Sequence, residues 1–373
     1  MDYSTLQELW WLICSIIGAF FIFLMFVQGG QTLLWQIAKT KNEKSLVINS
    51  LGRKWEITFT TLVVFGGSLF ASFPKFYATS FGGAYWVWIL ILFTFVIQAV
   101  SFEYRTKPNN FLGATVYETF LFINGSIGIL LIGAAVGTFF TGSNFTLSEF
   151  NFVTWQHSLR GLEAAFSPFN LCLGFFLVFN SRNLGAMYLI NNIDFSETPD
   201  MQARLRKASL MNFIISLPFL LYVLVCLLMC DGFGVNNDGQ IAMISNKYLS
   251  NFLANPILLI CLLLGLVLVI FGVFKTAFTE SCKGIWSAGA GTFLVGLTVL
   301  LLPAYNNTSF YPSKSDLQSS LTIYNASSSP YTLMVMTYVA LCIPFVIGYI
   351  AYVWKAMDNK QLTVNDINNK EAY

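Results

Sequence analysis

The sequence predicts an all-α polytopic membrane protein with nine transmembrane helices. Of its 373 residues, 56% are hydrophobic and only 10% are charged, whereas soluble domains carry roughly a quarter charged residues. The 37 Phe and 9 Trp point the same way, because aromatic side chains favour apolar interiors and membrane interfaces. This composition excludes a soluble globular enzyme, a disordered chain and a secreted disulfide scaffold. A net charge of +2 without a basic face argues against a nucleic-acid partner.

Nine segments are apolar over the length of about 20 residues that a helix needs to cross a bilayer. Their continuous hydrophobic runs favour helices over a β-barrel. Four segments precede a polar loop at 142–158 and five follow it. We therefore expect two four-helix bundles plus one extra helix, with the first bundle in 1–145 and the rest in 146–373. The expected spans are 6–38, 54–79, 84–104, 117–141, 160–192, 207–230, 256–277, 284–304 and 331–357.

The distribution of Lys and Arg in the loops predicts the orientation. If the loop after the first span is cytoplasmic, the outer side holds only Lys75, Arg160, Lys247 and Lys314. The other loop cations then lie on the cytoplasmic side, as the positive-inside rule requires. This places the N-terminus outside and the C-terminus inside, which an odd number of spans satisfies.

Polar side chains within spans are functional candidates, because they are costly in a bilayer. All of them fall in the predicted cytoplasmic half, where they suggest a proton or water path. In the alternative interpretation, the glutamates are ordinary first-turn carboxylates in headgroup water and the glutamines only join helices. The candidates are Glu56, which we expect to be buried beside Trp55, together with Glu118, Gln28, Gln31 and Gln98.

Two rows of small residues predict close helix packing against a partner. Gly66, Gly67 and Ala71 form one row in the second span, and Gly125 with Gly128 forms another in the fourth.

The chain lacks the residues of a self-sufficient catalyst. Its only histidine, His157, lies in an outer loop or at the very start of the fifth span, whereas a heme needs a His, Met or Cys ligand beside it. Cys226 and Cys230 lie one helical turn apart but far from that histidine in sequence, so we predict no metal site. No phosphate-binding glycine loop, Ser-His-Asp set or HExxH motif occurs.

Ordered motifs along the first 140 residues and near the end carry a family resemblance. Together they resemble subunit II of cytochrome bd quinol oxidase. They are Asp2-Tyr3, Leu9-Trp10-Trp11-Leu12, Ile48-Asn49-Ser50-Leu51-Gly52, Trp55-Glu56, Gly66-Gly67-Ser68-Leu69-Phe70-Ala71-Ser72-Phe73-Pro74, Phe102-Glu103-Tyr104-Arg105 and Leu321-Thr322-Ile323-Tyr324-Asn325-Ala326-Ser327-Ser328.

The resemblance implies a nine-helix subunit of the bacterial cytoplasmic (inner) membrane. Its partner would be a larger subunit I that carries heme b, heme d and the quinol site, and the complex would reduce dioxygen to water. The family's acid after the second-span Trp lies in a proton path, which implies that role for Glu56. A small single-helix subunit and a bound lipid or quinone stay open as further partners.

The chain departs from the family at charged positions. Family members often have Asp-Gly-x-Asp in the first helix, where this chain reads Met25-Phe26-Val27-Gln28. An Arg late in the third helix becomes Gln98, and the His before the second-span Trp becomes Lys54. These changes look like the loss of a paired charge network. A secondary transporter and a purely structural scaffold are the alternatives. A transporter commonly shows midplane charges at matching places in its two halves, and this sequence shows no such matched pair.

Overall fold

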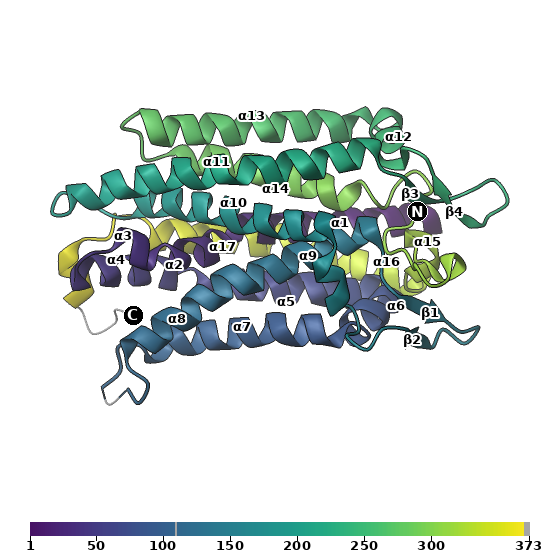
Figure 1. Ribbon diagram of the computed structural model, residues 1–373, viewed down its shortest axis with the longest axis horizontal. Helices are drawn as coiled ribbons and strands as arrows, with labels where there is room; N and C mark the ends of the chain where they lie inside the picture. The colour runs from purple at the N-terminus through teal and green to yellow at the C-terminus, as the bar shows by residue number, and fades with distance from the viewer. Residues whose placement is uncertain (109, 369–373) are drawn as a thin grey trace.

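Nearly all helices run side by side along one long axis (Figure 1). The computed structural model describes residues 1–108 and 110–368, so 369–373 of the second predicted bundle lie outside the described residues. Within them, eight helical spans are long and apolar enough to cross a membrane. The pair α16 (Pro330–Ala340) and α17 (Ile343–Met357), bent by 40°, makes a ninth. The predicted all-α class with nine spans is therefore confirmed.

The two ends of the long axis differ in character. One end, here called the hairpin end, carries the four short strands and the N-terminus (Figure 1). The opposite end, here called the basic end, carries the Lys44, Lys54, Arg105 and Arg204 ion pairs described below. The chain starts at the hairpin end, and the last span ends at the basic end, as an odd number of spans requires (Figure 1).

The first span is broken, although the sequence predicts one continuous helix over 6–38. It consists of α1 (Tyr3–Leu24), α2 (Phe26–Thr32) and α3 (Leu34–Ile37). At the second break, between α2 and α3, the Gln36 N–H donates to Leu33 O and not to Thr32 O. The Thr32 carbonyl can therefore accept a hydrogen bond from a side chain. Gly29 of α2 touches the backbone of α10 (Pro168–Asn192), where a Cβ would collide with the Ser181 carbonyl.

The second to fourth spans follow their predicted ranges closely. The Thr40 side chain and Glu43 form a capping box that starts the helix before the second span. A π-helical turn interrupts the fourth span, and there a Cβ at Gly125 would collide with the Gln28 carbonyl of α2. The elements are α4 (Lys41–Gly52), α5 (Trp55–Ser72), α6 (Pro74–Tyr77), η1 (Ala78–Gly82), α7 (Tyr85–Tyr104), α8 (Ala114–Ile123), η2 (Asn124–Gly128) and α9 (Ile129–Thr141).

The fifth and sixth spans begin elsewhere than predicted, and a proline sets each start. Residues 160–167 are not the start of a span, because Gly161 turns with φ +92° and α10 begins at Pro168. In contrast, α11 (Pro199–Met229) begins at Pro199 and absorbs much of the predicted 193–206 loop. Proline suits the first helical turn, where its missing N–H has no partner to lose.

Two β-hairpins and short helices close the hairpin end. Most of these ordered pieces lie where the sequence predicts the connections between spans, and η3 lies where it predicts the start of the fifth span. They are β1 (Phe145–Leu147) with β2 (Val153–Trp155), η3 (Leu162–Phe166), β3 (Gly232–Val235) with β4 (Ile241–Ile244), α12 (Lys247–Ala254), η4 (Leu317–Ser319) and α15 (Ile323–Ala326).

Spans pack together within each predicted half, and the two halves also share a core. In the second half, α10 pairs with α11, while α13 (Pro256–Phe278) pairs with α14 (Gly284–Leu301). Across the halves, α10 also packs on α2 and α9, and α1 packs on α14. The division at residue 145 stays a prediction.

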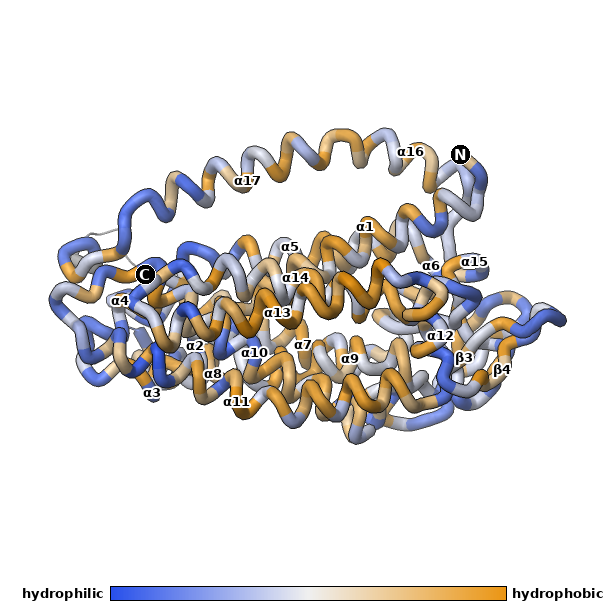
Figure 2. The backbone as a smooth tube through the Cα atoms, turned by 90° about the horizontal axis from the view of Figure 1, so that it is seen from above, coloured by the Kyte–Doolittle hydropathy of each residue, from blue (hydrophilic) through white to orange (hydrophobic). Residues whose placement is uncertain are grey.

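The ninth span stands apart from the bundle. None of the residues of α17 is buried, and the tube of α16 and α17 arches away between its two ends (Figure 2). At the hairpin end, Trp10 Nε1 donates to Leu333 O at 3.0 Å and to Thr337 Oγ1 at 3.1 Å. At the basic end, Lys54 pairs with Asp358 just after α17. The span is thus fixed at its ends and open along its middle.

Candidate functional site

The predicted glutamines meet in a buried chain of amides between the first, third and fourth spans. Gln28 Nε2 donates to Gln98 Oε1 at 3.4 Å, and Gln98 Nε2 donates to Gln31 Oε1 at 2.9 Å. Gln31 Nε2 continues the chain to Asn124 Oδ1 at 2.7 Å. All four side chains are buried. Where the resemblance implies acids facing an Arg, this chain therefore holds neutral groups that cannot titrate.

Glu118 is held by three segments at the basic end. Its carboxylate accepts from Lys44 Nζ at 2.7 Å, from Arg105 Nη2 at 2.9 Å and from Trp35 Nε1 at 3.1 Å. Only 3% of the Glu118 side chain is exposed. The pairing joins α3, α4 and the end of α7 to the second turn of α8, so Glu118 is more than a solvated helix-start carboxylate.

Glu56 lies apart from these groups and is not buried within this chain. It is exposed in the first turn of α5, which corrects the expectation of a buried carboxylate. Its neighbour Trp55 is partly buried and stacks on Phe102 of α7, with ring centroids 6.1 Å apart. Trp55 thus fixes the start of α5, while Glu56 faces whatever covers this helix.

Sequence reasoning misses an ion pair that fixes the end of the ninth span. Lys54 is fully buried, and its Nζ lies 2.9 Å from Asp358 Oδ1. Asn192 Nδ2 donates to the same carboxylate oxygen at 3.1 Å, and Tyr188 OH donates to the other at 3.4 Å. The signal in the sequence was Lys54 itself, a cation at the start of an apolar span, but its partner lies 304 residues away.

A second missed residue is Arg182, a cation within the fifth span. Three helices contribute its hydrogen-bond acceptors, which are Thr32, Gln36 and Asn212. A count of charges inside the apolar segments would have found it.

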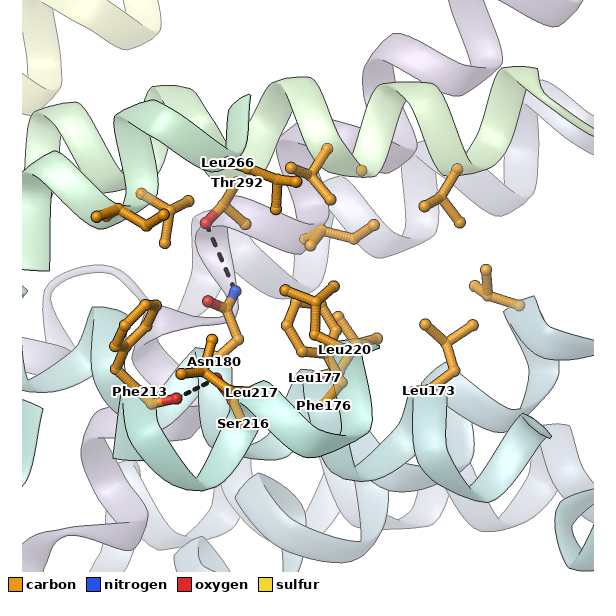
Figure 3. A pocket seen from close by; sticks show the side chains of 17 residues that line it. Leu173, Phe176, Leu177, Asn180, Phe213, Ser216, Leu217, Leu220, Leu266 and Thr292 are labelled. Carbon is orange, nitrogen blue, oxygen red and sulfur yellow. Dashed lines mark hydrogen bonds between the residues drawn. The ribbon is translucent and has the colours of Figure 1, made fainter. Parts of the chain in front are cut away.

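An apolar cavity of about 70 Å³ lies between α10, α11, α13 and α14 (Figure 3). Asn180 and Thr292 face each other across it, with Asn180 Nδ2 donating to Thr292 Oγ1 at 3.5 Å. Ser216 also lines the cavity, but its hydroxyl donates to Phe213 O at 2.7 Å within α11. Leu173, Leu177 and other aliphatic side chains form most of the wall (Figure 3). The cavity suits an alkyl chain.

The histidine of this chain offers no heme ligand within the described spans. The only histidine, His157, lies between β2 and η3 outside the spans, is 45% exposed and faces Glu163 at 3.5 Å. Within the described part of the chain, no three His, Cys, Asp or Glu side chains gather as a metal site.

The family model of cytochrome bd terminal oxidase subunit II matches residues 6–357. The chain belongs to this family. It is therefore a subunit of a quinol oxidase, a multi-pass protein of the bacterial inner membrane. The resemblance is confirmed, and a secondary transporter is no longer needed to explain the fold.

Several known proteins are similar to this subunit II chain over almost its whole length. A probable cytochrome oxidase subunit 2 of Haemophilus influenzae is 28% identical, covering 95% of this chain and 94% of that protein. The cytochrome bd-I ubiquinol oxidase subunit 2 of Escherichia coli is 26% identical over 98% of both chains. A chain of the bd oxidase from Geobacillus thermodenitrificans shares the fold, with a TM-score of 0.64, 14% identity and coverage of 95% and 98%.

Proposed function

We propose that this chain is the non-heme subunit of the oxidase, and that it supports a heme-bearing subunit I and delivers protons to it through Glu56. The exposed position of Glu56 on α5 carries the proposal. An ionisable side chain facing lipid is costly, and that cost is removed when a partner subunit covers it. Glu118 is already held by two cations, and the glutamines cannot titrate, so they position helices beside the path.

The face between α5 and α17 is the docking surface for subunit I. On α5, Val63 is 54% exposed and Phe70 is 58% exposed, and a Cβ at Gly67 would meet no atom within 4 Å. On α17, Phe345 is 80% exposed. The face is continuous with Glu56, the carboxylate that needs cover. A large apolar partner explains why the ninth span is held only at its ends.

The basic end faces the cytoplasm in this proposal. Its excess of Lys and Arg over the hairpin end satisfies the positive-inside rule. The N-terminus is then outside and the C-terminus inside. Glu56, in the first turn of α5, lies where protons from the cytoplasm would enter the interface.

The cofactors follow from this division. Hemes b and d belong to subunit I, where they supply the electron transfer and dioxygen chemistry, and quinol is the substrate of the complex. The cavity beside Asn180 suits the tail of a lipid or quinone. A small single-helix subunit remains a candidate third component on the exposed outer faces.

The test is Glu56→Gln in the assembled oxidase. The variant keeps the side chain's shape but cannot titrate, so we expect oxygen consumption to fall at least about tenfold, a barrier change of about 1.4 kcal/mol. Heme content should stay unchanged, and Glu56→Asp should retain substantial activity.

Glu197→Gln is the matched control, because Glu197 is an exposed carboxylate in the loop before α11. It should leave turnover unchanged. If Glu56→Gln turns over at the wild-type rate with protons still taken from the cytoplasm, the path lies in subunit I and this chain is a scaffold.

A further inference from the structure

Arg182 is a membrane-depth cation with neutral partners only. Its Nε donates to Asn212 Oδ1 at 2.9 Å, its Nη1 to Thr32 Oγ1 at 2.8 Å and its Nη2 to Gln36 Oε1 at 2.8 Å. Among the described residues, no carboxylate lies within 4 Å of it. These bonds orient the guanidinium but leave its charge without a counter-ion.

Four other cations at this end have a carboxylate or a helix end as partner. Lys54 faces Asp358, Arg105 faces Glu118, and Arg204 faces Glu43 at 2.6 Å. Arg206 Nη1 donates to Thr276 O at 2.6 Å in the last turn of α13, where a helix end attracts cations. The carbonyl of Thr32, freed by the break in the first span, explains one bond of Arg182. A neutral hydrogen-bond donor would serve the Thr32 carbonyl equally well. The break in the first span therefore does not explain why Arg182 carries a charge.

The Arg182 guanidinium lies between α3 and α11, which contribute Gln36 and Asn212. Gln36 is exposed there, and Trp35 is 41% exposed, as aromatic side chains at an interface often are. Lys207 is exposed on α11, about 7.5 Å nearer the basic end than Asn212 and one turn before exposed Met211, so it lies on the exposed face of this helix and not on the Asn212 face.

Further basic side chains surround the contact between α3 and α11. Arg204 Nε donates to Ile37 O at 2.7 Å, which holds the segment after α3 against α11. Lys39, just after α3, and Lys41, at the start of α4, are exposed and form no ion pair within the described chain. Positive charge that no carboxylate compensates therefore gathers around the contact between α3 and α11.

We propose that Arg182 and Lys207 bind the phosphodiester group of an anionic phospholipid in the leaflet at the basic end. Arg182 provides a planar donor set fixed by three neutral side chains, and Lys207 reaches the same phosphate from the water side. Basic pockets between spans on the cytoplasmic side commonly bind anionic lipid headgroups. The acyl chains lie along exposed Met211 and Ile215 of α11. The site is separate from Glu56 and does not depend on its role.

The test measures lipid binding to the purified, assembled oxidase by native mass spectrometry. The probes are phosphatidylglycerol, phosphatidylcholine and inorganic phosphate, each added alone. Inorganic phosphate is then added in competition with bound phosphatidylglycerol. We expect Arg182→Gln to weaken phosphatidylglycerol binding at least about fivefold, and Lys207→Gln to weaken it by a smaller factor. Arg182→Lys should retain only part of the binding, because it keeps the charge but loses the planar donor set, and phosphatidylcholine should bind more weakly than phosphatidylglycerol.

Arg206→Gln is the matched control, because it removes one guanidinium from the same end and should not change binding. Equal phosphatidylglycerol affinity in Arg182→Gln and wild type overturns the proposal, and leaves Arg182 a purely structural residue. Displacement of the lipid by inorganic phosphate also overturns it, because the site then binds free phosphate. If Arg182→Gln does not assemble, unchanged binding in Lys207→Gln overturns it.

Discussion

Charged side chains at the basic end fall into three kinds. Glu118 and Lys54 are buried and paired, so they hold helices together. Glu56 is exposed on α5 and available to a partner. Arg182 has only neutral contacts in this chain. The same residue types thus have different roles, because burial and pairing, and not charge alone, decide what each group does.

The Lys54–Asp358 pair predicts a large effect of a single substitution. Asp358→Leu leaves the fully buried Lys54 ammonium unpaired, so we expect it to destabilise the protein by about 3–5 kcal/mol. The double variant Lys54→Met with Asp358→Leu should recover most of that loss. The measurement is thermal unfolding of the purified oxidase.

Asp238→Leu is the control for this pair, because Asp238 is exposed in the turn between β3 and β4. It should change the unfolding temperature little. A loss of stability in the double variant as large as in Asp358→Leu would contradict the assignment of the pair as the anchor of the ninth span.

At the scale of the helix, the glycine rows have two different functions. A Cβ at Gly128 would contact the Thr94 hydroxyl of α7, so this glycine packs inside the chain. Gly67 faces open space on α5. The sequence predicts both rows as partner contacts, but only Gly67 of the α5 row faces open space, because Gly66 is buried and a Cβ there would lie 3.4 Å from the Phe81 ring. The difference arises because a π turn directs the fourth span against α2 and α7.

Substitutions at these glycines should separate folding from assembly. Gly128→Leu overpacks a closed contact, so we expect a loss of at least about 1–3 kcal/mol of stability. Gly67→Leu should leave the chain folded and reduce the amount of subunit I that co-purifies. Quantitative pull-down with thermal unfolding distinguishes the two. Normal assembly of Gly67→Leu would exclude α5 from the docking surface.

At the scale of the whole molecule, the division of labour between subunits is testable. Expressed alone, this chain should bind no stoichiometric heme, because its only histidine is exposed outside the spans. The complex with subunit I should show b-type and d-type absorbance. Pyridine hemochrome spectra of the two preparations measure this, and a full heme complement in the isolated chain would contradict the proposal.

Hydropathy alone predicted the number of spans and most of their limits. Crossing a bilayer is a local requirement that about 20 apolar residues satisfy wherever they occur. The exceptions are the starts of α10 and α11, which lie at Pro168 and Pro199. Hydropathy missed them because an apolar run continues before Pro168 and a charged segment follows Pro199. The ordered motifs also identified the family, because a set of motifs that follow one another in the family's order, from the first spans to the last loop, is more specific than any single motif.

Only the tertiary structure decided which polar groups meet. The sequence placed Gln28, Gln31 and Gln98 in the same half of the membrane, but the helix arrangement joined them into one chain. Asp358 had no visible link to Lys54. Lipid and side chains are equally apolar, so hydropathy does not specify which helices become neighbours. Close contacts at small residues and buried hydrogen bonds decide this, and they depend on the whole packed bundle.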